Sequence, residues 1–252
     1  ASRGLGDVYK RQILHDSRNS QSLCNNIIWS SYVDKNNNIW LGTDYGVSLM
    51  LNNSTYQLIH ISEITGKGDG NEFTCLYMDS SDKYWYGGVN GLLLFENDKY
   101  RWFNTQSQQN HLMHNRIRSI YEDRDHIVWI ATDGGVARYD NKQEKFIYYT
   151  IIDKTKEKKA NWAYDIYEDE DANLWIATYL GGLFIVNKHH LLSHNDQVPY
   201  IADWNSCSSN DTTRLSSIIY QIQSDKYGNI WANSQDGLVK IDPKTKRFNR
   251  IH

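Results

Sequence analysis

The sequence predicts an all-β fold, a β-propeller of four-stranded antiparallel blades, because one unit of about 45 residues recurs five times. Each unit carries a tryptophan, an aspartate six residues before it and a glycine six residues after it. A period near 45 residues with this much Trp, Tyr and Gly is typical of propeller blades. The aspartate–tryptophan pairs are Asp34–Trp40, Asp79–Trp85, Asp123–Trp129, Asp169–Trp175 and Asp225–Trp231, and the glycines are Gly46, Gly91, Gly135, Gly181 and Gly237.

The third unit shows the expected strands most clearly, because turn-forming residues separate its apolar runs. These strands are expected at 117–122, 127–132, 136–140 and 145–149. The aspartate begins the first turn by accepting backbone hydrogen bonds, the tryptophan fills the wedge between neighbouring sheets, and the glycine permits the next turn. The residue two after the tryptophan is small in four units (Gly42, Gly87, Ala131, Ala177), so that the next sheet can approach closely.

Composition argues against several classes of function. The net charge is -3, from 27 basic and 30 acidic residues without a block of like charge, which disfavours nucleic acid or a membrane surface as the main partner. The cysteines Cys24, Cys75 and Cys207 form no CxxC pair, so neither a disulfide framework nor a zinc site is expected. No apolar run reaches the length of a membrane span, and the first residues lack the apolar stretch of a signal peptide.

The chain divides into three parts. Residues 1–12 match no part of the unit, and we interpret them as a non-native scar or a disordered segment. Residues 13–25 are expected to be the outer strand and exit loop of a preceding blade. The five blades are expected at about 26–70, 71–114, 115–160, 161–216 and 217–252. The fourth blade is about ten residues longer than the others, and residues 199–204 are expected to form its outer strand.

The pattern from Asn26 to His252 resembles the two-component regulator propeller repeats. Their consensus has an aspartate, a turn, a Trp-Ile-Gly-Thr-like strand and a Gly-Gly-Leu-like third strand. The matching segments are 39–43 (IWLGT), 128–132 (VWIAT), 174–178 (LWIAT), 134–136 (GGV) and 181–183 (GGL). Gly88 and Ser234 stand where the consensus has threonine. The resemblance implies that the five blades are a slice of a seven-bladed propeller or of a tandem pair of them.

The same resemblance implies a function. Such repeats build the periplasmic sensor region of hybrid two-component histidine kinases, typically in gut Bacteroidetes, ahead of a membrane span and kinase domains. A module of this kind is implied to sense oligosaccharides released from glycans, joined to further blades and signalling domains, as a homodimer in an inner-membrane protein. No enzymatic activity and no cofactor are expected of this segment. Two alternatives stay open: a propeller enzyme acting on glycans as a lyase or hydrolase, and a purely structural protein-interaction propeller.

Comparison of the five units with one another indicates where a ligand binds. Positions that stay constant serve the fold, whereas positions that vary in chemistry at one place are free for function. The residues seven and five before the aspartate vary most, and period-two alternation places both on one strand face at the entrance of the innermost strand. Aromatic rings there suit sugar faces, and arginine forks suit carboxylate or sulfate groups. The candidate ligand-binding residues are Trp29, Glu72, Arg116, Arg118, Trp162, Tyr164 and Tyr220, with Asn90, Asp133 and Tyr179 from the turns after the second strands.

No catalytic residue and no metal site are nominated. The histidine-containing segments 111–114 and 189–194 have no carboxylate or cysteine at ligand spacing, so no bound metal is expected. Acid–base chemistry on a glycan would need paired carboxylates on the channel face. Only Glu72 and Asp165 are expected near that face, and they belong to different blades.

Overall fold

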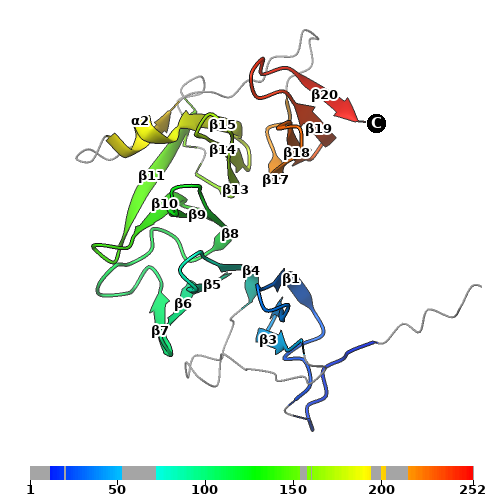
Figure 1. The fold of residues 1–252 in the computed structure, drawn as a ribbon. Helices are drawn as coiled ribbons and strands as arrows, with labels where there is room; N and C mark the ends of the chain where they lie inside the picture. Colours follow the sequence, from blue (N-terminus) through cyan, green and yellow to red (C-terminus); the bar gives the residue numbers. More distant parts are fainter. Residues whose placement is uncertain are drawn as a thin grey trace, which may run out of the picture.

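The computed structural model describes residues 12–19, 21–52, 72–153, 158–159, 161–193, 200–202 and 215–251. Five sheets follow one another along the chain and fan out around a common centre, as a propeller requires (Figure 1). Strands that follow one another in the chain pair in an antiparallel manner within each sheet. The prediction of an all-β propeller with five blades is therefore confirmed.

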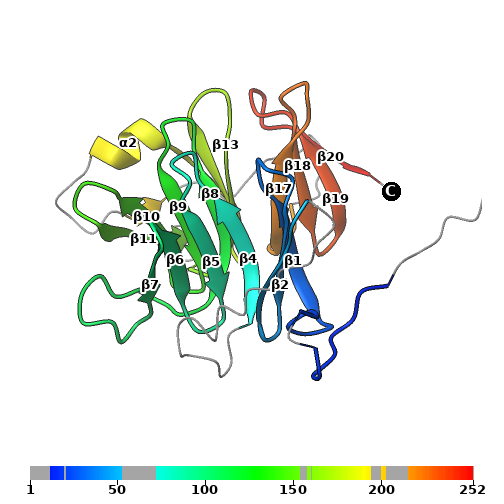
Figure 2. The same cartoon turned by 60° about the horizontal axis from the view of Figure 1, so that its bottom comes forward.

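Each sheet begins with its innermost strand and continues outward by hairpins. Sheet 1 comprises β1 (Ile28–Val33), β2 (Ile39–Thr43) and β3 (Gly46–Met50), and sheet 2 comprises β4 (Phe73–Met78), β5 (Tyr84–Gly88), β6 (Leu92–Glu96) and β7 (Lys99–Phe103). Sheet 3 comprises β8 (Ile117–Glu122), β9 (Val128–Thr132), β10 (Gly135–Asp140), β11 (Lys145–Asp153) and a short β12 (Lys158–Lys159). Sheet 4 comprises β13 (Ala163–Glu168), β14 (Asn173–Thr178) and β15 (Gly182–Asn187), and sheet 5 comprises β17 (Ile219–Ser224), β18 (Ile230–Ser234), β19 (Gly237–Ile241) and β20 (Phe248–Ile251). Adjacent innermost strands pack against each other in chain order (Figure 2).

The segment before the first sheet packs on that sheet without forming a strand. Residues 12–19 and 21–25 contain turns where an outer strand and exit loop are expected. Cys24 is buried, and its backbone N–H donates to Ser48 Oγ of β3 at 3.0 Å. Residues 1–11, interpreted above as a scar, lie outside the described residues, and the limits given for the blades stay a prediction.

The constant spacing of aspartate and tryptophan has the same structural cause in all five blades. The aspartate Oδ2 accepts the indole Nε1–H of the tryptophan six residues later, at 2.7–3.0 Å. The Oδ1 atom accepts the backbone N–H groups two and four residues ahead, which closes the turn between the first two strands. Asp79, for example, binds Trp85, Ser81 and Lys83 in this way. One carboxylate therefore fixes both the turn and the tryptophan.

The same hydrogen bonds favour the ionised form of the aspartate. Burial acts to raise the pKa of Asp34, but the bonds from Trp40, Asn38 and Asn36 outweigh it and hold that pKa below its usual value. The same competition lowers the pKa of Asp225. A depressed carboxyl pKa gives its full stabilisation of the folded chain above the unfolded-state pKa of about 3.9. These contributions to the free energy of unfolding are therefore present at neutral pH and are lost as the pH falls through the folded-state pKa.

The tryptophans fill the wedges between neighbouring sheets. Trp85, Trp129 and Trp175 are fully buried. Trp85 belongs to a core cluster with residues of sheet 3, and its ring centroid lies 5.1 Å from that of Tyr139. Trp231 of the last sheet is only partly buried. The expected role of the tryptophan in blade-to-blade packing is thus confirmed, and its burial depends on a following sheet.

Small residues two positions after the tryptophan let that following sheet approach. A Cβ at Gly87 would lie 2.6 Å from Cγ2 and 2.9 Å from Cβ of Ile117 in sheet 3. A Cβ at Gly42 would lie 2.4 Å from the backbone oxygen of Phe73 in sheet 2. Both distances are too short for any side chain, so these two glycines are required by close approach of the sheets, as predicted.

We expect Gly87→Ala to lower the free energy of unfolding by roughly 1–3 kcal/mol, the usual cost of overpacking a dense core. Urea denaturation followed by tryptophan fluorescence measures this change. The matched control is Asn233→Ala, two residues after Trp231 in sheet 5, where the side chain is exposed and a change within about 0.5 kcal/mol is expected. A Gly87→Ala protein as stable as the wild type would show that the sheets can separate without loss.

The segment that follows the fourth sheet crosses to the third. The helix α2 (Lys188–Ser193) comes directly after β15, and its Leu191 is buried in the core shared by sheets 3 and 4. The strand β16 (Tyr200–Ala202) then pairs in parallel with β11. The prediction that residues 199–204 form the outer strand of the fourth blade is therefore wrong in its partner. β11 continues beyond its pairing with β10, so the backbone of residues 150–152 is available to β16. Residues 199, 203 and 204 lie outside the described part of the chain.

The first and last sheets expose faces that the middle sheets bury. Ile28 in β1 is 46% exposed, whereas Ile117 and Ile219 begin the corresponding strands of later sheets and are fully buried. Leu238 in β19 and Leu183 in β15 each follow the turn glycine of their strand. Leu238 is 41% exposed, whereas Leu183 is 1% exposed. Burial of these positions therefore comes from packing between sheets and not from the sheet that carries them.

Candidate functional site

A bulge interrupts every innermost strand at one of the variable positions. In sheet 3, Ile117 pairs with Thr132 and Ser119 pairs with Ala131, which leaves Arg118 as the extra residue. The bulge residues of the five sheets are Trp29, Thr74, Arg118, Tyr164 and Tyr220. A bulge re-aims the side chain that it carries and breaks the alternation of faces. The bulge, and not period-two alternation alone, therefore sets the direction of the side chain five residues before the aspartate.

Bulge residues contact the first residue of the turn between the second and third strands. In sheet 1, Trp29 Nε1 donates to Asp44 Oδ1 at 2.8 Å. In sheet 3, Arg118 Nε and Nη2 donate to the two carboxylate oxygens of Asp133 at 2.7 and 3.0 Å. The two groups of candidates, from the strand entrances and from the turns, thus meet within one blade.

Sheets 3, 4 and 5 join these residues into one continuous cluster. The guanidinium carbon of Arg118 lies 4.4 Å from the ring centroid of Tyr164. The Tyr164 ring stacks with Tyr220 at 5.9 Å and contacts Tyr179 at 5.8 Å. Tyr179 stacks with Trp162 at 5.1 Å. We call this group the aromatic–arginine cluster, and its members are Arg118, Asp133, Trp162, Tyr164, Tyr179 and Tyr220.

Solvent reaches the aromatic–arginine cluster at both ends. Trp162 is 46% and Tyr220 is 39% exposed, whereas Tyr164 between them is half-buried. Burial raises the pKa of the Tyr164 hydroxyl, and the nearby guanidinium only partly offsets this, so the hydroxyl is protonated at neutral pH. The cluster therefore offers ring faces together with neutral hydroxyl groups.

The turn beside the cluster in sheet 4 is one residue longer than its counterparts. Thr178 Oγ1 donates to the backbone oxygen four residues ahead, whereas the corresponding threonine or serine of sheets 1, 3 and 5 reaches three residues ahead. As a result Gly182, and not Gly181, takes the positive φ of the turn. The extra length places Leu180, with a φ of 71° and 62% exposed, next to Tyr179.

Four of the ten candidates lie outside the cluster. Trp29 is exposed on sheet 1, Asn90 is exposed in the turn after β5, and Glu72 is half-buried directly before β4. Arg116 is exposed before β8, where its backbone oxygen accepts the N–H of Asp133 at 3.3 Å. The structure therefore brings the side chains of six candidates together, all from sheets 3 to 5.

Asp165, considered above for acid–base chemistry, holds three sheets together. Its Oδ1 accepts the hydroxyl of Ser119 in sheet 3 at 2.6 Å, and its Oδ2 accepts the backbone N–H of Ile222 in sheet 5 at 2.9 Å. Burial raises the pKa of Asp165, and these hydrogen bonds oppose the rise. Both carboxylate oxygens are thus used in contacts between blades.

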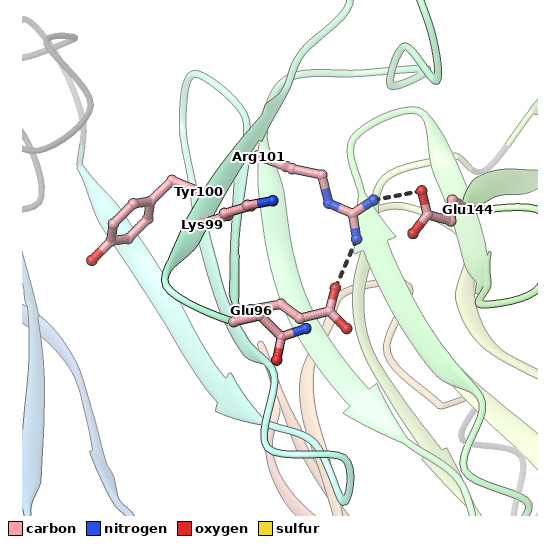
Figure 3. Close-up of a pocket in the computed structure, with 6 residues that line it drawn as sticks. Glu96, Lys99, Tyr100, Arg101 and Glu144 are labelled. Carbon is pink, nitrogen blue, oxygen red and sulfur yellow. Dashed lines mark hydrogen bonds and ion pairs between the residues drawn. The ribbon is translucent and has the colours of Figure 1, made fainter.

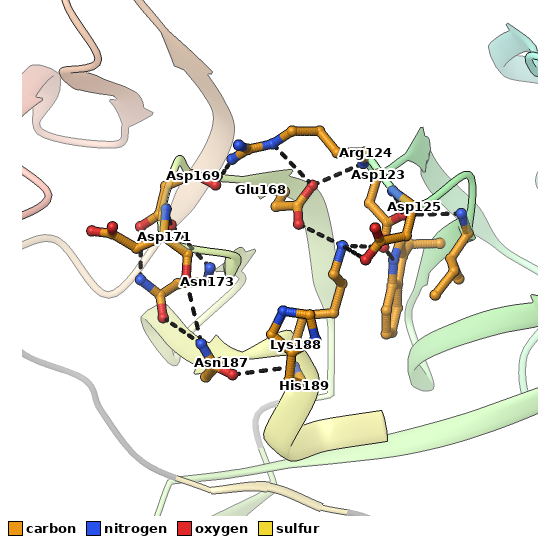
Figure 4. Close-up of polar contacts among 12 residues, drawn as sticks. Asp123, Arg124, Asp125, Glu168, Asp169, Asp171, Asn173, Asn187, Lys188 and His189 are labelled. Carbon is orange, nitrogen blue, oxygen red and sulfur yellow. Dashed lines mark hydrogen bonds and ion pairs between the residues drawn. The ribbon is translucent and has the colours of Figure 1, made fainter. Parts of the chain in front are cut away.

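Comparison of the repeats missed a polar network at the C-terminal end of the innermost strands (Figure 4). The aromatic–arginine cluster lies at the other end of these strands. Lys188, the first residue of α2, is 1% exposed, and its Nζ lies 2.6 Å from Glu168, 2.7 Å from Asp125 and 3.3 Å from Asp123. Burial alone would lower the pKa of Lys188, but the three carboxylates outweigh it and raise that pKa above its usual value. Glu168 also accepts the backbone N–H of Arg124 at 2.9 Å. These ion pairs and the hydrogen bond connect α2 and sheet 4 to the first turn of sheet 3.

A related bridge joins sheets 2 and 3. Glu122 of sheet 3 accepts the backbone N–H of Ser80 in sheet 2 at 2.9 Å. Glu168 of sheet 4 accepts the backbone N–H of Arg124 in sheet 3 in the same way. Ser80 Oγ and Glu122 both contact Nδ1 of His126, at 2.9 and 3.3 Å. A nucleophile–base–acid relay needs partners on opposite ring nitrogens, so these residues do not form a catalytic triad. The sequence signal for both bridges is a glutamate directly before the repeat aspartate, which occurs only in units three and four.

A pocket outside the predicted site lies at the outer rim between sheets 2 and 3 (Figure 3). Its lining residues are Glu96, Asn97, Lys99, Tyr100, Arg101 and Glu144. Arg101 lies between Glu96 and Glu144, 3.0 Å from each carboxylate. These ion pairs connect β7 to the turn before β11, so the pocket is bordered by a structural contact between blades.

Comparison with known proteins points to one family. The model of the two component regulator propeller matches residues 22–45 and 111–134. An extracellular domain assigned to a hybrid two-component system of B. thetaiotaomicron is 46% identical with a TM-score of 0.70, over 96% of this chain and 33% of that one. A second such domain from this organism is 22% identical with a TM-score of 0.67, over 93% and 29% of the two chains.

More distant proteins share the fold alone. Virginiamycin B lyase of Staphylococcus aureus is 11% identical with a TM-score of 0.60, over 89% of this chain and 70% of that one. Comparison with curated proteins found no match. Among the helices that the structure describes, none has the length and apolar character to cross a membrane. The chain spans about a third of the length of the first solved relatives. The repeat match and the 46% identical extracellular domain together show that the chain carries two component regulator propeller repeats and is similar to the extracellular domains of hybrid two-component systems.

Proposed function

We propose that the chain is part of an extracytoplasmic sensor propeller of a hybrid two-component system and binds a glycan-derived oligosaccharide at the aromatic–arginine cluster. The observation that supports this is the cluster itself. Three neighbouring blades bring aromatic and polar side chains together at a position where the repeats differ in chemistry. Constant residues such as Asp123 and Trp129 are used by the fold and leave no such freedom.

The chemistry of the cluster suits a sugar. The exposed rings of Trp162 and Tyr220 can stack on the apolar face of a pyranose, as aromatic rings do on other apolar surfaces. The neutral tyrosine hydroxyls both donate and accept hydrogen bonds, which matches the hydroxyl groups around a sugar ring. The two exposed rings lie on adjacent sheets, so an oligosaccharide of several units would contact more of the cluster than a monosaccharide.

The related domains support the proposed location, and the partners are a further part of the proposal. Those domains are extracellular, which supports a periplasmic position for this chain as part of an inner-membrane protein. In this proposal its partners are further blades and signalling domains of a longer chain, which acts as a homodimer. The proposal assigns recognition and not catalysis to this segment, because Asp165 on β13 is used in hydrogen bonds between sheets.

Trp162→Ala is expected to weaken oligosaccharide binding by roughly 3- to 10-fold, because one aromatic stacking contact contributes about 0.5–1.5 kcal/mol. A glycan array would identify the tightest oligosaccharide, and isothermal titration calorimetry would then compare the variants. Trp29→Ala is the matched control, since Trp29 is an exposed indole at a bulge on sheet 1, outside the cluster. Equal affinities of wild type and Trp162→Ala, with both proteins folded by circular dichroism, would contradict the proposed site.

A further inference from the structure

Resting on the proposed function, we infer that the aromatic–arginine cluster selects uncharged saccharides and that Arg118 is a positioning residue for Tyr164. The residue types alone favour the opposite conclusion, because an arginine fork beside aromatic rings suits a uronic acid or a sulfated sugar. The contacts of Arg118 decide between the two.

Arg118 uses one edge of its guanidinium, the Nε–Nη2 edge, on a carboxylate within its own blade. Nε and Nη2 donate to the two oxygens of Asp133 at 2.7 and 3.0 Å, which is the bidentate geometry that recognises a carboxylate. The Asp133 side chain is only 9% exposed, so this charge pair is largely shielded from water. The negative charge of Asp133 balances that of the guanidinium, so a ligand carboxylate that approached the remaining Nη1–Nη2 edge would meet no net positive charge and would be repelled by Asp133.

The flat face of the guanidinium is used as well. Its carbon lies 4.4 Å from the centroid of the Tyr164 ring, a distance at which an arginine stacks on an aromatic ring. Tyr164 in turn stacks with Tyr220 on the next sheet, with an angle of 18° between the ring planes. Asp133 therefore orients Arg118, and Arg118 orients the ring at the centre of the cluster. The pair supplies a fixed platform and no net charge.

The equivalent position in sheet 1 shows that the contact between a bulge residue and the turn aspartate does not require a cation. There the bulge residue is Trp29, and its indole N–H donates to Asp44 at the same turn position. The turn aspartate thus serves in both sheets to hold the side chain at the bulge. Arg116, two residues before Arg118, is the exposed cation that a test of charge selectivity must treat separately.

The test compares wild type, Asp133→Asn and Arg118→Gln on a glycan array that holds neutral, uronic-acid-containing and sulfated oligosaccharides. Wild type is expected to bind neutral oligosaccharides. In Asp133→Asn the ratio of acidic to neutral affinity should rise by roughly tenfold, the usual effect of one hydrogen bond to a charged group, because the fork is released. Arg118→Gln should weaken the binding of neutral oligosaccharides by loosening Tyr164, and it should abolish the gain when combined with Asp133→Asn.

The outcomes separate this inference from the proposed function. Wild-type preference for acidic oligosaccharides that disappears in Arg118→Gln would overturn the inference and leave the proposed function intact. The same preference lost in Arg116→Ala would also overturn the selectivity for neutral sugars. A folded wild type that binds no oligosaccharide on the array would overturn the proposed function and the inference together. If Asp133→Asn does not fold, Arg118→Gln alone still decides, because an anion-binding Arg118 would lose acidic and not neutral ligands.

Discussion

Lys188→Met is expected to lower the free energy of unfolding by about 3–5 kcal/mol at pH 7, because breaking a buried ion pair leaves charges without a partner in the protein interior. The Lys188 and Glu168 side chains are each 1% exposed, and their charged atoms lie 2.6 Å apart. Methionine fills a similar volume without a charge, so the loss measures the cation and not a cavity. Urea denaturation gives the free energy, and hydrogen exchange of β11 reports whether β16 detaches from sheet 3.

Burial should distinguish this lysine from a similar one in sheet 5. Lys240 also faces a repeat aspartate, Asp225, but at 3.8 Å and with 37% of its side chain exposed. We expect Lys240→Met to change the free energy of unfolding by less than about 1 kcal/mol, as for other exposed pairs. Equal losses in the two variants would contradict the role of burial. Because the pKa of Lys188 is raised in the folded chain, its stabilising effect is complete below the unfolded-state value of about 10.4 and is lost as the pH rises through the folded-state pKa.

The blades were predictable because their determinants are local. Asp123 and Trp129 are six residues apart, and one hydrogen bond between them recurs in every blade, so the spacing can be read directly from the chain. The pairing of Tyr200–Ala202 is different, because its partner is β11 of the third sheet, although β15 is the described edge strand of the fourth. The partner strand β11 lies some 50 residues earlier in the chain, and no sequence pattern within residues 200–202 indicates this pairing.

Variation among the repeats predicted all six residues of the aromatic–arginine cluster but not the contacts between them. Arg118 and Asp133 vary between units, yet their contact depends on a bulge, and a bulge is a property of strand register that a single strand sequence does not show. Comparison of repeats also cannot find a residue outside the repeat. Lys188 begins a helix that occurs in one blade alone among the described residues, so its network with Glu168 became visible only in the folded chain.

Asp79→Ala is expected to lower the free energy of unfolding by about 3–5 kcal/mol. The substitution removes the acceptor of the Trp85 indole N–H and of the backbone N–H groups of Ser81 and Lys83. Trp85 is fully buried, so water cannot replace the lost carboxylate at the indole. Each buried donor left without a partner costs roughly 1–3 kcal/mol. Urea denaturation followed by circular dichroism measures the loss without relying on the tryptophan signal.

Asp225→Ala is the matched control, because Asp225 makes the same set of bonds in a blade where Trp231 is only partly buried. Water can reach those donors, so a smaller loss than that of Asp79→Ala is expected there. A double-mutant cycle with Trp85→Phe then isolates the indole bond. Once the indole donor is absent, Asp79→Ala should cost roughly 1–2 kcal/mol less than in the wild type. Additive losses would instead mean that the aspartate stabilises only the turn, and the six-residue spacing to the tryptophan would need another cause.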